Sequence, residues 1–264
     1  MTAADTAFAG SIPARYDHSL GPLLFEPYAK IVAERASAFA PGRILETAAG
    51  TGIVTEALHC TLPEAEIVAT DLNQAMLDVA SRKIQSDRVR FQAADALDLP
   101  FADGEFDLVV CQFGVMFYPD KVRGNAEARR VLRNGGHYLV AIWDELDRNP
   151  VSQAISRAVA AEFPADPPRF IERAPFSYAD KDRIERDLRS AGFTDIAVQT
   201  MPVASRVDAH EAAYGMCCGS PLTAEIEERG PGAVERAAKA AEAALADYDG
   251  KDVPMSAILV SARK

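Results

Sequence analysis

The stretch Ile44-Leu45-Glu46-Thr47-Ala48-Ala49-Gly50-Thr51-Gly52 decides how the rest of this 264-residue chain is interpreted. An apolar run leads directly into a loop of very small residues, and a helical pattern follows at 53–59. Small residues let backbone N–H groups approach a ligand without an intervening side chain. The order of strand, glycine loop and helix therefore indicates a ligand-binding turn, although many plain strand-to-helix turns also contain G-x-G.

On both sides of this loop the chain alternates β-rich runs with helical patterns, which favours βαβ units and a mostly parallel sheet. The β-rich runs are apolar almost throughout, as in strands that helices cover on both faces. These runs lie at 43–46, 67–71, 89–94, 106–112, 138–142, 195–198 and 258–262. Helices are expected at 23–39, 53–59, 75–84 and 126–132. We therefore expect an α/β, doubly wound sheet of seven strands.

The chain shows no repeat and no long linker, so we expect a single domain over 1–264. A helical segment at 1–40 precedes the first strand, and helical insertions at 145–190 and 205–255 interrupt the later strands. In the second insertion, Glu235 and Lys239 have the spacing and orientation of a favourable helical ion pair. We expect the insertions to cover the substrate side of the sheet.

Composition limits the possible partners. The formal net charge is −11 and the basic residues form no large cluster, so a nucleic-acid partner is not expected. No run approaches about 18 apolar residues, and no secretory signal opens the chain, so we expect a cytoplasmic protein without a membrane span. The four cysteines include no C-x-x-C pair, which favours free thiols and no metal site.

Two acidic residues end the strands that follow the glycine loop. Asp71 comes 19 residues after Gly52 and could accept hydrogen bonds from ribose hydroxyls, or it could cap the helix that begins near Asn73. Asp95 ends the third strand and could accept a hydrogen bond from an adenine amino group, or it could form an Asx-turn into Leu97. Both patterns are compatible with a nucleoside ligand.

Five segments together resemble the successive motifs of class I S-adenosylmethionine-dependent methyltransferases. They read ILETAAGTG, IVATDLN, VRFQAADALDLPF, FDLVVCQFGVMFYPD and RRVLRNGGHYLVAIWD. The resemblance extends over 13–264, with its specific part at 43–144, and is closest to the small-molecule group that includes the ubiquinone- and menaquinone-biosynthesis methyltransferases. It implies a Rossmann-like, seven-stranded, mostly parallel sheet with an antiparallel last strand and helical cap insertions.

The resemblance also implies a cofactor, S-adenosyl-L-methionine, and a place for it on the glycine loop. Glu46 would support the methionine amino end, and the backbone of Gly50, Thr51 and Gly52 would run along the cofactor. The family's first motif glycine is replaced by Ala48, which we expect to be tolerated where φ is negative or the strain is small.

Further cofactor contacts follow from the other motifs. The resemblance implies that Asp71 holds the ribose, that Leu72 and Met76 pack against adenine, and that Asp95 and Ala96 read the adenine edge. Gln112 and Phe113 would lie near the methionine moiety and the methyl group. The segment 1–40 would form the family's N-terminal lid, in which Tyr16 closes over the cofactor.

No residue stands out as a general base for methyl transfer. His59 and His137 have structural interpretations, at a helix end and at a strand entry. His18, His210 and Tyr118 are the remaining candidates for a catalytic role. The motifs therefore specify the methyl donor and leave open the acceptor, the atom that is methylated and the oligomeric state.

Three functions remain to be compared. The first is methyl transfer, by in-line displacement, to a small and apolar or aromatic acceptor. The second is a non-catalytic regulatory module that binds S-adenosylmethionine or S-adenosylhomocysteine. The third is a nicotinamide dehydrogenase, which Thr55 disfavours because it stands where a full G-x-G-x-x-G requires the last glycine.

Overall fold

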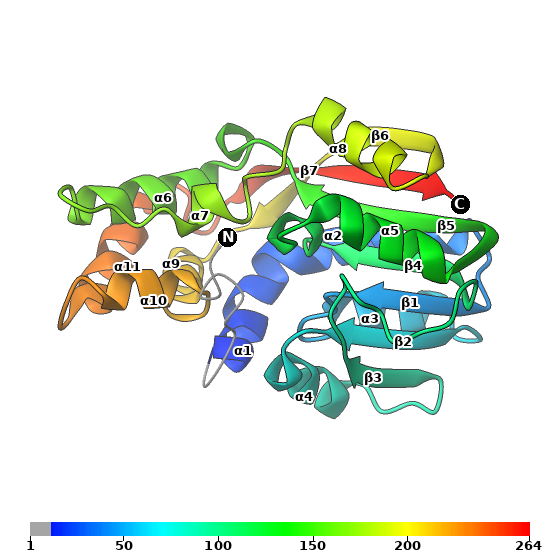
Figure 1. The fold of residues 1–264 in the computed structure, drawn as a ribbon. Coiled ribbons are helices and arrows are strands. Elements are labelled where there is room, and N and C mark those ends of the chain that lie inside the picture. The colour runs from blue at the N-terminus through cyan, green and yellow to red at the C-terminus, as the bar shows by residue number, and fades with distance from the viewer. Residues whose placement is uncertain (1–11) are drawn as a thin grey trace. The chain divides into compact units, whose positions relative to one another are not determined.

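A computed structural model describes residues 12–264 (Figure 1). Its seven strands form one sheet in the order β3-β2-β1-β4-β5-β7-β6. Their bounds are β1 Arg43–Thr47, β2 Glu66–Asp71, β3 Val89–Ala93, β4 Phe106–Gln112, β5 Leu132–Trp143, β6 Thr194–Arg206 and β7 Asp252–Arg263. The first five strands pair in parallel. The sequence-based expectation of a doubly wound α/β sheet is confirmed.

The last strand runs antiparallel to β5, as expected. Lys264 N donates to Gly136 O at 3.0 Å and Asp144 N donates to Ser256 O at 3.2 Å, so residue numbers rise along β5 as they fall along β7. Both β5 and β7 begin about six residues before the apolar runs at 138–142 and 258–262. Polar residues and glycines interrupt the apolar pattern early in β5, and Asp252, Pro254 and Ser256 interrupt it in β7, so the apolar pattern alone placed both beginnings too late.

Helices connect most of the strands. Their bounds are α1 Ile12–Arg15, η2 Tyr16–Phe25, α2 Glu26–Ser37, α3 Ile53–Thr61, α4 Gln74–Lys83, η3 Val115–Phe117, α5 Lys121–Val131, η4 Leu146–Arg148, α6 Pro150–Glu162, α7 Phe170–Arg173, α8 Lys181–Ser190, α9 Ala209–Cys218, α10 Leu222–Glu227 and α11 Ala233–Ala244. The leading helical segment begins earlier than the 23–39 expected, because η2 is a π-helix that contains Pro22. Its wider hydrogen-bond spacing produces no simple amphipathic period.

The chain divides into two compact units. The helical unit contains the described residues up to Pro27 together with Trp143–Ser177 and Pro202–Ser256, and the sheet unit contains Tyr28–Ile142, Tyr178–Met201 and Ala257–Lys264. In the helical unit, α11 packs against α6 and α9. The expected pair between Glu235 and Lys239 is present on α11 at 3.0 Å. The assignment of 1–40 as a lid and of 145–190 and 205–255 as caps stays a prediction.

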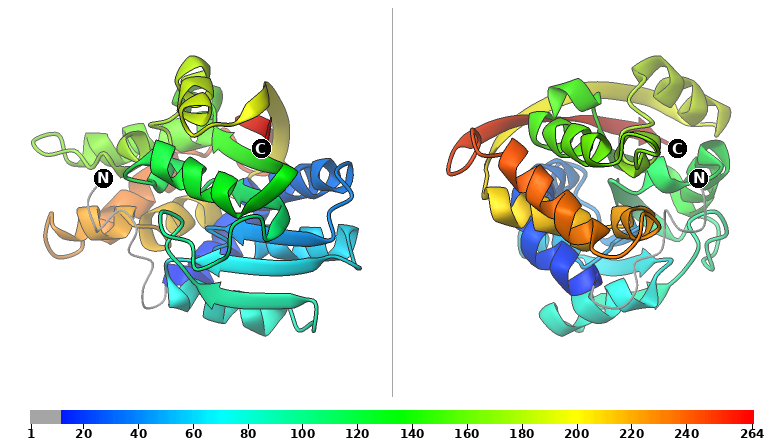
Figure 2. Two further views of the ribbon diagram at one scale, coloured as in Figure 1. Left: turned by 45° about the vertical axis from the view of Figure 1, so that its right-hand side comes forward. Right: turned by 90° about the vertical axis from the view of Figure 1, so that its left-hand side faces the viewer.

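The sheet unit brings the functional strand ends together. Because β1 pairs in parallel with β2 on one side and β4 on the other, the loops that follow all three strands leave from the same edge of the sheet. The strands are buried and apolar up to those ends, where polar residues begin. Two further views show β2 and β3, in cyan and teal, with α4 packed against them (Figure 2).

In the helical unit a buried amide joins the end of β5 to the beginning of β7. Asn149 Nδ2 donates to the carbonyl oxygens of Glu145 and Ser256, both at 3.1 Å, and Asn149 Oδ1 accepts from Ser256 N at 3.1 Å. Ser256 Oγ in turn donates to Asp144 Oδ2 at 2.7 Å. Asn149, Ser256 and Asp144 are buried, so the bonds among them replace those that water would otherwise make.

We predict that Asn149→Ala lowers the free energy of unfolding by about 2 kcal/mol, because it leaves the buried N–H and C=O of Ser256 without their amide partner. Asn134→Ala, at an exposed position of β5, is the matched control and should change stability by less than about 0.5 kcal/mol. Urea denaturation of the three proteins measures both values. Equal stability of the two variants would contradict this account of the link.

Candidate functional site

The carboxylate of Glu46 is buried at the end of β1. It is 1% exposed, its Oε2 accepts a hydrogen bond from Thr55 Oγ1 at 2.6 Å, and its carbonyl oxygen accepts one from Thr70 Oγ1 at 2.9 Å. Burial, with a smaller contribution from the charge of Asp71, raises the pKa of Glu46 to about 8, although the hydrogen bond from Thr55 lowers it. Thr55 lies on the buried face of α3, and sequence inspection did not identify it as a partner of Glu46.

Asp71 lies at the end of the neighbouring strand and joins two loops. Its Oδ2 accepts from Gly50 N at 2.9 Å, and its Oδ1 accepts from Asn73 N at 2.8 Å. Burial raises its pKa, and these hydrogen bonds oppose that shift. Asp71 therefore orders the turn before α4, as the capping alternative requires, and it also fixes the glycine loop. Only the second contact connects it to the candidate site.

The two carboxyl groups lie at adjacent strand ends, and ionising both would create a strongly negative site. Among the described residues no cationic side chain offsets the charge of Glu46, whose pKa responds to burial, Thr55 and Asp71. Ionised carboxylates that are buried without a cation are costly. The arrangement therefore favours a ligand that brings a positive charge and hydrogen-bond donors.

The glycine loop has a left-handed backbone at three positions. Gly50 and Gly52 have φ values of 57° and 82°, and Ala48 has a φ of 54°. Of the two conditions under which alanine was expected to be tolerated, a negative φ is therefore not met, and small strain remains. A left-handed alanine costs roughly 1 kcal/mol, which the loop tolerates because the contacts of neighbouring residues fix its path.

Gly114, after β4, makes room for Ala48. A Cβ on Gly114 would lie 2.4 Å from Ala48 Cβ and 2.8 Å from Cys111 Sγ. Glycine is therefore required at position 114, in the turn after β4, to leave space for the alanine at position 48. Sequence inspection missed Gly114, because the contact joins residues 66 positions apart.

Polar and apolar groups line the loop where a ligand would lie. The hydroxyl oxygen of Thr51 is buried and has no hydrogen-bond partner in the described part of the chain. Leu72 is 60% exposed, whereas Met76 is buried, with its Cε 3.6 Å from the place of a Cβ on Gly50. An exposed leucine and an orphaned hydroxyl are consistent with a ligand that has both apolar and polar parts.

At the end of β3, Asp95 forms the Asx-turn that was one of its two alternatives. Its Oδ1 accepts from Leu97 N at 2.8 Å, and the side chain is exposed. Ala96 is half-buried beside it. The turn leaves Asp95 Oδ2 available to a ligand, so a role for Asp95 and Ala96 at an adenine edge stays a prediction.

Gln112 and Phe113 end the fourth strand. Phe113 has a φ of 55°, its N–H donates to Ala141 O at 2.8 Å, and its ring packs edge-on against Tyr28 with centroids 5.4 Å apart. Tyr118, five residues later, is buried and donates its hydroxyl hydrogen to Thr47 Oγ1 at 3.1 Å. Burial raises the pKa of Tyr118 well above its usual value, so the phenol stays protonated at neutral pH.

The remaining candidates belong to the helical unit. Tyr16 begins η2 and stacks on Phe25 with centroids 4.8 Å apart. His18 is exposed on the same helix. His210, on α9, stacks on Tyr214 and lies 3.3 Å from a carboxylate oxygen of Glu242. The roles of Tyr16, His18 and His210 stay predictions.

The two other histidines have the structural surroundings expected of them. His59 lies in the last turn of α3. His137, in β5, stacks on Phe39 with centroids 4.1 Å apart, and burial lowers its pKa. Within residues 12–264 no three His, Cys, Asp or Glu side chains are grouped to hold a metal ion. No described helix combines the length and apolar character needed to cross a membrane.

Comparison with known proteins connects this site to a family. A family model described as a methyltransferase domain matches residues 45–140. A demethylmenaquinone methyltransferase of Clavibacter sepedonicus is 31% identical over 180 residues, which are 63% of this chain and 72% of the relative. One of Deinococcus radiodurans is 38% identical over 137 residues, which are 49% of this chain and 56% of the relative. The match thus spans about half to three quarters of these relatives.

Solved structures share the fold. The cyclase SpnF aligns with a TM-score of 0.59 at 20% sequence identity, over 96% of this chain and 93% of its own. At that identity the likeness concerns the fold alone, and a fold does not determine its chemistry.

We predict that Glu46→Gln removes a pH dependence of stability. The folded-state pKa of about 8 lies above the ordinary value of 4.5, so the folded protein holds an extra proton between these values. The free energy of unfolding of the wild type should therefore fall as pH rises from 5 to 8, by up to about 1.4 kcal/mol per pH unit, and level off above. Urea denaturation at several pH values measures it, and identical profiles for wild type and variant would contradict the burial argument.

A double-mutant cycle tests the contact between the two loops. Gly114→Ala should destabilise by about 1–3 kcal/mol, because its Cβ would overlap Ala48 and Cys111. Ala48→Gly relieves the left-handed alanine and should offset part of this loss when the two are combined. Additive effects in thermal denaturation would show that Ala48 and Gly114 do not interact.

Proposed function

Since this chain belongs to the class I S-adenosylmethionine-dependent methyltransferases, we propose that it methylates a small-molecule acceptor and binds its methyl donor on the loop Glu46–Gly52. One observation carries the proposal. Glu46 and Asp71 are buried carboxylates with raised pKa values at adjacent strand ends, and they flank a left-handed glycine loop. S-adenosylmethionine has two cationic groups and two ribose hydroxyls. These would supply the positive charge and the hydrogen-bond donors that the two buried carboxyl groups lack.

The residues present fit this donor. An ammonium group near Glu46 would compensate the buried charge and lower the pKa of that carboxyl. The hydroxyl of Thr51, which has no partner among the described residues, would gain one from the same end of the ligand. Asp71 would receive ribose hydroxyls on Oδ2, which has a lone pair beyond the one used by Gly50, and on Oδ1 in competition with Asn73 Nδ2, which donates to it at 3.4 Å.

An adenine ring would lie along the start of α4. Leu72 would cover one face of the ring, which explains why this leucine is exposed in the protein alone. Met76 would form the apolar floor below Gly50. Asp95 and Ala96 would read the adenine edge, with Asp95 Oδ1 kept in place by the Asx-turn.

Catalysis would depend mainly on positioning. The donor supplies an activated methyl group with a good leaving group, so the protein's task is to align the acceptor and exclude water. Gln112 and Phe113 would lie closest to the methyl group, at the end of β4. Tyr118 stays protonated and is committed to Thr47, so a general base would have to come from His18, His210 or the acceptor itself.

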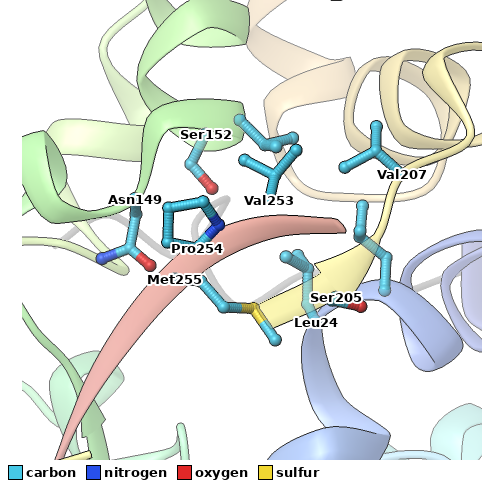
Figure 3. Close-up of a pocket in the computed structure, with 10 residues that line it drawn as sticks. Leu24, Asn149, Ser152, Ser205, Val207, Val253, Pro254 and Met255 are labelled. Carbon is cyan, nitrogen blue, oxygen red and sulfur yellow. The ribbon is translucent and has the colours of Figure 1, made fainter. Parts of the chain in front are cut away.

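The acceptor is proposed to be apolar or aromatic. The relatives' names support a quinone-type acceptor, since they are demethylmenaquinone methyltransferases. The helical unit contains a small recess with a volume of about 10 Å³, well below that of a small-molecule site (Figure 3). Its walls are mostly apolar, and the amide of Asn149 is already hydrogen-bonded to Ser256; the recess is lined by Leu23, Leu24, Asn149, Val151, Ser152, Ser205, Val207, Val253, Pro254 and Met255.

The alternative is a non-catalytic module that binds S-adenosylmethionine or S-adenosylhomocysteine. It uses the same donor site, so binding cannot separate the two. Transfer of a labelled methyl group to quinol, phenol and amine acceptors separates them. Turnover with any of these acceptors supports the enzyme, and donor binding without turnover across the panel supports the module.

We predict that S-adenosylmethionine and S-adenosylhomocysteine, at a hundredfold over their dissociation constants, each stabilise the protein by about 2.7 kcal/mol in thermal denaturation. NAD should give no shift. Asp71→Asn should remove most of the stabilisation, because an amide accepts fewer hydrogen bonds than a carboxylate. Asp78→Asn, on the exposed face of α4, is the matched control.

Two outcomes would contradict the proposal. No shift with either sulfur ligand would overturn the donor site, and a shift with NAD alone would replace it with a dinucleotide site. An equal loss in both aspartate variants would show that Asp71 has no special role in binding.

A further inference from the structure

We infer that Tyr118 is a positioning residue that ties the turn after β4 to the end of β1 and thereby holds the donor loop in its binding conformation. The inference rests on the proposed function. Tyr118 directly follows η3, and its hydroxyl donates a hydrogen bond to Thr47 Oγ1 at 3.1 Å. Thr47 is the last residue of β1 and directly precedes the left-handed Ala48.

The surroundings of the Tyr118 hydroxyl leave it little freedom. The side chain is buried, and Cys111 Sγ lies 3.5 Å from the same oxygen. Burial also keeps the phenol protonated, so it acts as a hydrogen-bond donor over the whole physiological pH range. Its use is therefore to hold Thr47.

The chain also makes specific room for the ring. A Cβ on Gly124 would lie 2.5 Å from Tyr118 Cδ2, so only glycine fits at this position of α5. A glycine inside a helix costs about 1 kcal/mol relative to alanine, and the fit of the tyrosine ring accounts for it here. Lys121 Nζ donates to the carbonyl oxygens of Tyr118 and Met116, at 2.7 and 3.2 Å, and closes the turn from the other side.

The hydrogen bond between Tyr118 and Thr47 affects the donor site through the neighbouring residues Gly114 and Phe113. Gly114, at the start of the same turn, packs directly on Ala48. Phe113, with its left-handed backbone, precedes Gly114 and is one of the two residues proposed to face the methyl group. Two interactions thus connect the turn 113–118 to the loop 46–52. Gly114 packs on Ala48, and Tyr118 donates a hydrogen bond to Thr47.

The test is the affinity for S-adenosylhomocysteine, measured by titration calorimetry on the whole chain. Tyr118→Phe keeps the ring and removes the hydroxyl, and we expect it to weaken binding about tenfold. Thr47→Val removes the acceptor and should weaken binding by a similar factor, with no further loss in the double variant. Tyr178→Phe is the matched control: it also removes a buried phenol hydroxyl, bonded to Asp187 at 2.8 Å, and should leave the affinity unchanged.

A structural role alone would lower the melting temperatures of the Tyr118→Phe and Tyr178→Phe variants and leave both affinities at the wild-type value, and that result would overturn the inference. Amide hydrogen exchange provides a readout without ligand, because loss of the tie should speed exchange at 48–52 in Tyr118→Phe and not in Tyr178→Phe. If the wild type does not bind S-adenosylhomocysteine, the proposed function fails. Unchanged exchange at 48–52 would then still overturn the positioning role.

Discussion

The structure of the site depends on the burial of two carboxylates at the ends of β1 and β2. Glu46 and Asp71 are held by a threonine hydroxyl and by backbone N–H groups, and these bonds only partly offset the cost of removing the charges from water. The part of this desolvation cost that the hydrogen bonds do not offset raises the pKa values of Glu46 and Asp71. The free protein therefore contains a site that destabilises it at neutral pH and that a cationic ligand would stabilise. This constraint explains why small residues follow β1, since the backbone must turn tightly around Asp71.

Loop geometry follows from the same constraint. The hydrogen bond from Gly50 to Asp71 fixes one side of the loop, and the contact between Ala48 and Gly114 fixes the other. Ala48 fits in the loop because Gly114, in the turn after β4, has no side chain to contact it. Binding and positioning are thus shared between the turns after β1 and β4, which are far apart in sequence and adjacent in the sheet.

The sequence was sufficient for the succession of strands along the chain and for the polar residues at strand ends, because apolar runs and glycine turns are local signals. The antiparallel last strand followed from the family resemblance. It was insufficient where a conformation depends on distant residues. The φ of Ala48 depends on Gly114, the pKa of Glu46 depends on complete burial, and the role of Tyr118 depends on Thr47. The π-helix at Tyr16–Phe25 was missed because its hydrogen bonds follow no amphipathic period. For Asp71 the contacts with Asn73 and Gly50 place its two oxygens on different loops, and its role at a ribose stays a prediction.

The most direct measurement of the central claim is the number of protons released when S-adenosylmethionine binds at pH 6.5, from calorimetry in buffers of different ionisation enthalpy. With a pKa of about 8, Glu46 is almost fully protonated in the free protein at this pH and must ionise to meet a cationic ligand. The account predicts release of close to one proton by the wild type and none by Glu46→Gln. Binding by the wild type without proton release would contradict it.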